Sequence, residues 1–173
     1  MSDKCLPDIE DVVRALFTPS MLDNNEMVSL SAFKLRHNED YFSVARMSID
    51  GWMDDIKRIP QNPQRQLYGY CKMNVGGIRK LGFIHDENNE IGFDVQDKSS
   101  ESNKSHAGIT ILFGENILKG DKAEVLKPIP YGVSAIGLLM RIQTKLVQLA
   151  NENIVKLQEP LAEDKQAEGL TKE

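Results

Sequence analysis

The sequence predicts an α+β domain in which a mostly antiparallel sheet of about five to six strands packs against a long C-terminal helix, with a short helix at the N-terminus. Several short runs alternate apolar and polar residues and are separated by clusters of Asn, Asp, Gly and Ser, which is typical of antiparallel strands. A stripe of apolar residues near the C-terminus has helical spacing instead. The 173 residues, of which 40% are hydrophobic, suffice for one sizeable core. We therefore expect an N-terminal helix and linker over 1–27, one α+β domain over 28–158, and an acidic, disordered tail over 159–173.

The first half of the chain is predicted to form a helix, a hairpin and a second helix. Asp8–Phe17 places apolar residues on one helical face after a capping Asp8. Val28–Arg36 and Tyr41–Met47 alternate apolar and polar residues around a turn-like segment, so they are expected to pair. Trp52–Arg58 is expected to be a short helix.

The second half supplies the remaining strands. Tyr70–Val75 alternates and is broken by two glycines, and Ile78–His85 is expected to pair with Ile91–Gln96 across a turn rich in Asp and Asn. Ala107–Phe113 is almost entirely apolar, which predicts a central strand buried on both faces. The polar residues 97–105 before it form a surface loop.

The final helix is predicted from Ile136 to Leu157, about six turns long. The simplest interpretation is that its apolar stripe packs on the chain's own sheet, but apolar residues lie on more than half of its circumference, so the helix is either deeply buried or shared with a partner. We favour binding to a second copy or another protein subunit. The residues expected at this interface are Ile136, Leu139, Met140, Leu146, Val147 and Ile154.

Charge and composition exclude several classes of function. The net charge is −5, of which −3 lies in the tail, so nucleic-acid binding is not favoured, although a local basic face is compatible with the sequence. Cys5 and Cys71 are expected to be free thiols, and neither has the spacing of a zinc ligand. We expect no metal and no cofactor. No stretch approaches the roughly 18 to 20 apolar residues that a membrane helix needs, and the acidic N-terminus is unlike a signal peptide, so the cytoplasm is the expected location.

His106 is the principal catalytic candidate because it lies where a polar loop enters an apolar strand. A lone histidine at such a place more often closes the loop by a hydrogen bond. Ser43 and Arg36 are the other catalytic candidates, and Asp94 is a further partner for the histidine. A Gly-x-Ser-x-Gly elbow is missing, which argues against a serine hydrolase of that type. A transferase of ADP-ribose would place Arg36 at a strand end, where an ordinary solvated arginine is the simpler interpretation.

A second candidate site is the pair Arg79 and Lys80, which follows Gly76-Gly77 and could contact an anion. The glycines are not part of a phosphate-binding motif, so a turn or a bulge is the simpler interpretation. Basic residues also alternate with Tyr68 and Tyr70 in this region. That composition is compatible with single-stranded nucleic acid and also with an ordinary solvated face, which we favour.

Two segments, Tyr41-Phe42-Ser43-Val44 and Ser105-His106-Ala107-Gly108-Ile109, resemble an uncharacterised group of small bacterial proteins. In that group a Leu-Ser-Val strand precedes a Ser-His-Ala-Gly-Ile segment. The resemblance spans about Val28 to Phe113 and carries no activity. It implies a bacterial source and favours neighbouring strands for Ser43 and His106.

Two functions are compatible with the sequence. The favoured one is a non-enzymatic accessory subunit or interaction module of a bacterial multicomponent system, a class that includes defence systems. The alternative is a small enzyme acting on a nucleotide or nucleic acid, with His106 as acid or base. The position of His106 relative to Ser43, Arg36 and Asp94 discriminates between them.

Overall fold

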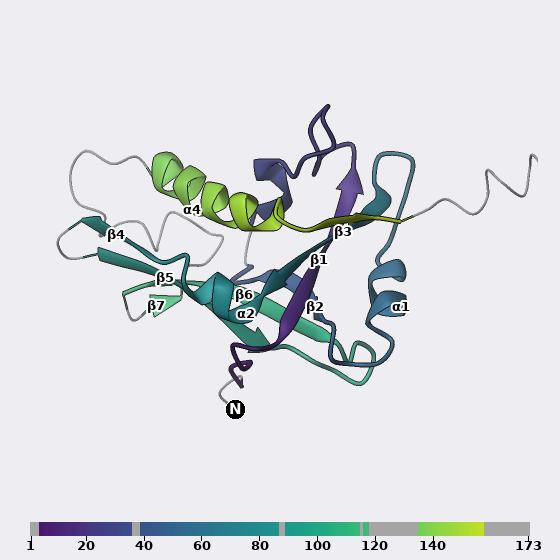
Figure 1. The fold of residues 1–173 in the computed structure, drawn as a ribbon, viewed down its shortest axis with the longest axis horizontal. Helices are drawn as coiled ribbons and strands as arrows, with labels where there is room; N and C mark the ends of the chain where they lie inside the picture. The colour runs from purple at the N-terminus through teal and green to yellow at the C-terminus, as the bar shows by residue number, and fades with distance from the viewer. Residues whose placement is uncertain (1–3, 36–38, 87–88, 115, 118–134, 158–173) are drawn as a thin grey trace, which may run out of the picture.

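The computed structural model describes residues 4–35, 39–86, 89–114, 116–117 and 135–157 (Figure 1). These residues form one antiparallel sheet of eight strands, more than predicted, beside short helices. Seven strands follow the order β4-β5-β6-β2-β1-β3-β8, and β7 pairs with β6. The strands are β1 (Asp11–Thr18), β2 (Phe42–Arg46), β3 (Gln66–Asn74), β4 (Phe83–Asp86), β5 (Asn89–Asp97), β6 (His106–Phe113), β7 (Asn116–Ile117) and β8 (Ile154–Lys156). The helices are the 3-10 helix η1 (Leu30–Phe33) and the α-helices α1 (Trp52–Lys57), α2 (Val75–Arg79) and α4 (Ala135–Ala150).

The predicted N-terminal helix is wrong, because its residues form β1 in the interior of the sheet, between β2 and β3. Val12 and Leu16 pack on one face of the sheet, and Val13 and Phe17 pack on the other. Both faces of β1 are covered, so apolar residues follow one another without alternation. Their spacing then coincides with that of a helix.

The predicted first hairpin is also wrong in its first strand. Val28 to Phe33 forms a bridge and the helix η1, whose Ala32 and Phe33 are buried. The second predicted strand is present as β2, but it pairs with β1 and β6. The alternation near residue 30 therefore reflects a loop packed on the core and not a strand.

The predicted hairpin is confirmed as β4 and β5, although Ile78 and Arg79 of its first strand belong to α2, and the central strand β6 is confirmed. Phe83 pairs with Ile91 in the hairpin. β6 lies between β5 and β2, and Ile109 and Ile111 on it are buried. The diglycine prediction is wrong in detail, because Gly76 and Gly77 lie in α2, where the Asn74 side chain caps the helix by accepting from the Gly77 amide.

The predicted long C-terminal helix is not observed. Helix α4 has 16 residues and ends at Ala150, and the chain then turns to form β8 at the edge of β3. Two asparagines hold this turn. The Asn151 Oδ1 accepts from the Val28 amide at 2.8 Å, and the Asn153 carbonyl accepts from the Lys72 amide at 2.9 Å. The β-branched pair Ile154 and Val155 then favours an extended chain.

The two faces of the sheet bear unequal cores. One face packs on α4, α2 and η1, and we call this larger cluster the α4-side core; it includes Leu138, Ile142 and Leu146. The other face packs on α1, and this α1-side core is centred on Val13 and Ile56. Among the described residues, no helix combines the length and the apolar character needed to span a bilayer.

Candidate functional site

Ser43 on β2 and His106 at the start of β6 lie side by side, as the resemblance led us to expect. Ser43 is opposite Gly108 and His106 is opposite Ala45, so the two side chains are diagonal neighbours on one face of the sheet. The His106 Nε2 lies 3.2 Å from the Ser43 Oγ. Ala45 belongs to the α1-side core, so the pair lies on the face that α1 covers in part. Arg36, the third catalytic candidate, lies outside the described residues.

Tyr41 and Lys98 complete the surroundings of the histidine. The Tyr41 ring lies edge to face with His106, with 5.7 Å between centroids, and the Lys98 Nζ is 4.9 Å from the centroid of the Tyr41 ring. The Tyr41 ring also rests on Gly108, where a Cβ would come within 2.6 Å of it. Glycine at this position therefore permits the tyrosine to pack beside the histidine.

Burial lowers the pKa of His106 below its ordinary value, and the positive charge of Lys98 lowers this pKa further. A hydrogen bond with the Lys98 backbone and the charge of Asp97 oppose this shift. The ring therefore favours its neutral form, and a neutral imidazole can accept the Ser43 hydroxyl proton at Nε2, which lies within hydrogen-bond distance of the Ser43 Oγ.

Arg14 fixes the backbone of Ser43. The register of β1 and β2 joins only Val12 and Val13 to β2, and the next residue, Arg14, reaches across with its side chain. Its NH1 donates to the Ser43 carbonyl at 2.7 Å, and its Nε donates to the Ala32 carbonyl at 3.1 Å. The guanidinium thus binds a backbone carbonyl of β2 close to the point where the pairing of β1 with β2 ends.

The candidate anion contacts, Arg79 and Lys80, lie at the C-terminal end of α2. The Arg79 guanidinium binds the Asp8 carboxylate at 2.5 Å and the Asp94 carboxylate at 2.8 Å, and Lys80 is exposed beside it. Asp94, proposed as a partner of His106, also accepts a hydrogen bond from the Cys5 thiol. Burial raises the pKa of Asp94, but the hydrogen bonds from Cys5 and Arg79 outweigh this effect and lower it overall. These groups stabilise the N-terminal segment beside β5.

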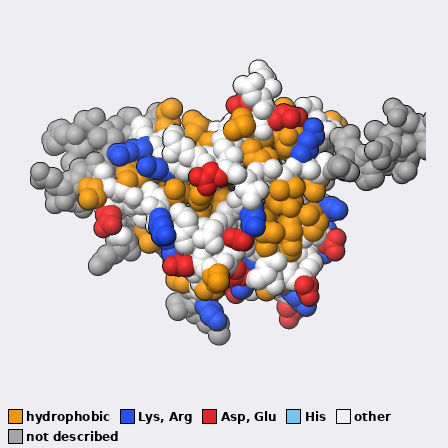
Figure 2. All heavy atoms as spheres, viewed as in Figure 1, with side chains coloured by type: hydrophobic (Ala, Val, Ile, Leu, Met, Phe, Trp, Pro, Cys, Tyr) orange, Lys and Arg blue, Asp and Glu red, His pale blue; other side chains and the backbone are white. Residues whose placement is uncertain are grey.

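Other cations near Tyr68 and Tyr70 also have partners within the chain. Arg58 pairs with Asp55, Lys72 pairs with Asp11, and the Arg65 guanidinium lies over the Phe17 ring. Figure 2 shows basic and acidic side chains interspersed on the face that it presents. This arrangement does not favour a nucleic-acid interface, which requires a continuous basic surface.

The residues predicted for a helix interface divide into buried and exposed sets. Leu146 is fully buried, while Leu139, Val147 and Ile154 are partly buried against the α4-side core. Met140 is 50% exposed, and only the backbone of Ile136 is described. The outward positions of α4 are otherwise small or polar: Gly137, Arg141, Thr144 and Gln148. The protein's own sheet therefore covers most of the apolar surface that suggested a docking helix.

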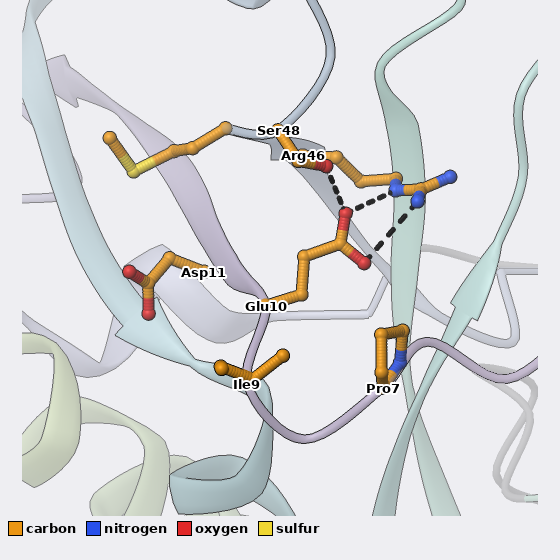
Figure 3. Close-up of a pocket in the computed structure, with 7 residues that line it drawn as sticks. Pro7, Ile9, Glu10, Asp11, Arg46 and Ser48 are labelled. Atoms are coloured by element: carbon orange, nitrogen blue, oxygen red, sulfur yellow. Dashed lines mark hydrogen bonds and ion pairs between the residues drawn. The ribbon is translucent and has the colours of Figure 1, made fainter.

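An open hollow of about 550 Å³ near the N-terminus was not predicted (Figure 3). Glu10, only 7% exposed, binds the Arg46 Nε at 2.8 Å and the Ser48 hydroxyl within it. Arg46 also binds Asp97 at 3.3 Å. The lining residues are Pro7, Ile9, Glu10, Asp11, Arg46, Met47 and Ser48.

Ile9, one of these lining residues, projects from a turn and is 88% exposed. The turn spans Pro7–Glu10, closed by a hydrogen bond from the Glu10 amide to the Pro7 carbonyl at 3.1 Å, and we call it the Ile9 turn. Ion pairs from Asp8 to Arg79 and from Glu10 to Arg46 hold it on both sides. The sequence signal was Pro-Asp-Ile-Glu, a typical turn composition, which the helical spacing of the following residues obscured.

No protein-family model, curated protein or solved structure matches the chain. The Ser43–His106 pair and the Ile9 turn are the candidate functional features of the described residues.

The described part of the chain contains no group of three or more His, Cys, Asp or Glu side chains that could hold a metal ion. The chemistry available at the Ser43–His106 pair is proton transfer between a hydroxyl and a neutral imidazole.

Proposed function

We propose that the protein is an accessory subunit that works by binding another protein chain, through the Ile9 turn and the adjoining hollow. The observation that carries this proposal is the 88% exposure of Ile9 on a turn that two ion pairs hold in place. The resemblance to small bacterial proteins favours a bacterial multicomponent system, such as a defence system, as the setting.

An exposed isoleucine gains about 1.5 to 3 kcal/mol when a partner buries it. A side chain on a preorganised turn loses little conformational freedom on binding, so more of this gain appears as affinity. Glu10 and Arg46 are already paired, and Asp11 and Ser48 lie at the same hollow. They supply the polar surroundings that interfaces usually have around an apolar anchor. This surface replaces α4 as the expected interface.

The partner that we propose is a second copy of this chain. The interface of a twofold dimer is self-complementary, since a contact from residue i of one copy to residue j of the other is repeated from residue j of the first to residue i of the second. The Ile9 turn offers a protruding apolar side chain at the hollow, which Pro7 and Met47 also line. Ile9 of each copy would then enter the hollow of the other.

Light scattering on a sizing column tests this proposal. We expect a dimer for the unchanged protein and a monomer for Ile9→Asp, because an aspartate cannot be buried in the hollow without a large desolvation cost. Ile84→Asp is the matched control, since Ile84 is 72% exposed on β4 and lies outside the hollow. A monomeric unchanged protein, or a dimeric Ile9→Asp variant, contradicts the proposal. If Met140→Asp dissociates the dimer and Ile9→Asp does not, the interface lies at α4.

A second candidate function is a small enzyme with His106 as acid or base, favoured by the 3.2 Å contact between His106 and Ser43. The nucleotide substrate has less support, because Arg79 is neutralised by two carboxylates. The two candidate functions use separate residues and are compatible with each other.

A further inference from the structure

We infer that Ser43 is the nucleophile of an acyl-transfer site, with His106 as its general base and a carboxylic ester as the class of substrate. This inference rests on the second candidate function and is independent of dimerisation through the Ile9 turn.

The geometry meets the requirements of an activated serine. Ser43 is exposed, so a substrate can reach its hydroxyl. The His106 Nε2 is within hydrogen-bond reach at 3.2 Å, and the Tyr41 ring packs edge to face against the imidazole. A serine and a base within hydrogen-bond reach of each other are the two groups that activation of a hydroxyl requires. Arg14 holds the Ser43 backbone in place through its carbonyl.

The charges at the site favour an ester over a phosphate. Lys98 and Asp97 are the charged residues whose fields act on His106, with opposite effects. Two opposite charges beside the histidine suit a neutral substrate. An ester develops a single negative charge on its carbonyl oxygen in the transition state, and the Lys98 ammonium beside Tyr41 can stabilise this charge. A phosphate would instead bring several negative charges to the site.

The proposed reaction needs only Ser43, His106, the ester and water. The Ser43 Oγ bonds to the carbonyl carbon of the ester while His106 Nε2 takes the hydroxyl proton. The bond from this carbon to the alcohol oxygen then breaks, and the alcohol leaves with the proton from His106. Water next attacks the acyl group on Ser43, His106 again accepts a proton and returns it to the Ser43 oxygen, and the carboxylic acid departs.

A fluorophosphonate probe, which loses fluoride when a reactive serine attacks its phosphorus, tests the inference by intact-protein and peptide mass spectrometry. We expect one adduct, on Ser43, and none on the Ser43→Ala variant. His106→Asn should slow labelling about 100-fold or more, because a general base contributes on the order of 10² to 10⁴ in rate. Ser31→Ala removes an exposed serine in η1 and should leave labelling unchanged. A protein that is not labelled, or labelling as fast in His106→Asn, overturns the inference.

Ser43→Cys provides a second measurement that does not depend on how the histidine variant folds. A thiol beside His106 should become a thiolate and react with iodoacetamide near pH 6, whereas a thiol without such a base reacts slowly there. Cys5 is an internal reference, because its hydrogen bond to Asp94 raises its pKa. Cys71 is buried, which raises its pKa to about 12. Alkylation at position 43 no faster than at Cys5 overturns the inference.

Discussion

At the scale of single residues, burial of His106 links stability to pH. The pKa of His106 in the folded protein lies below its ordinary value of 6.5, so between these two values the unfolded state binds more protons. The contribution of the neutral ring to stability is therefore complete above about pH 6.5 and decreases as the pH falls through the folded pKa. We expect His106→Gln to remove this part of the pH dependence, measured by urea unfolding between about pH 5 and 8. An unchanged slope in the variant would mean that the ring is not desolvated.

The same residue shows how far the sequence could identify the candidate site. Ser43 and His106 were both recognised from the sequence, but 63 residues separate them. Their contact depends on the register of β2 and β6, which no local pattern specifies. Ile9 was missed for a related reason. Its exposure follows from a turn held by Arg46 and Arg79, both distant in the sequence.

At the scale of elements, strands with ordinary patterns were predicted and strands with both faces covered were not always recognised. The segment between β4 and β5 is rich in Asp and Asn in the sequence, and β2 alternates, so local patterns sufficed for both. β1 lacks alternation because apolar residues cover both of its faces, and a helical spacing resulted. The last strand, β8, was assigned to the preceding helix because its three residues continue the apolar stripe of α4.

The position of β8 depends on a glycine opposite it. Gly69 on β3 pairs with Lys156, and a Cβ at Gly69 would overlap the Val155 carbonyl oxygen. We expect Gly69→Ala to displace β8 and to lower the free energy of unfolding by about 1 to 3 kcal/mol, as overpacking usually does. Hydrogen exchange should show lost protection at Lys72, whose amide donates to Asn153. Gly92→Ala is the matched control, because a Cβ there makes ordinary contacts of 3.6 Å with Leu112. Retained protection at Lys72 in Gly69→Ala would show that β8 tolerates the methyl group.

At the scale of the whole molecule, β1 joins the two cores, since Leu16 lies in the α4-side core and Phe17 lies in the α1-side core. A change in one core should therefore be felt in the other. Trp52 is the single tryptophan of the chain and lies against the α1-side core, where it contacts Tyr70 at 5.2 Å between ring centroids. Its fluorescence reports on that side of the sheet alone.

We expect Leu146→Ala, in the α4-side core, to lower the free energy of unfolding by about 2 to 5 kcal/mol, because the truncation leaves a cavity in a fully buried site. Urea unfolding should shift equally when followed by Trp52 fluorescence and by far-ultraviolet circular dichroism, since a cooperative domain gives coincident transitions. Met140→Ala, on the exposed side of the same helix, should shift both transitions by less than about 1 kcal/mol. A Trp52 transition that stays in place while the dichroism shifts would mean that the α1 side folds independently, and the two cores would then be separate cooperative units joined by one strand.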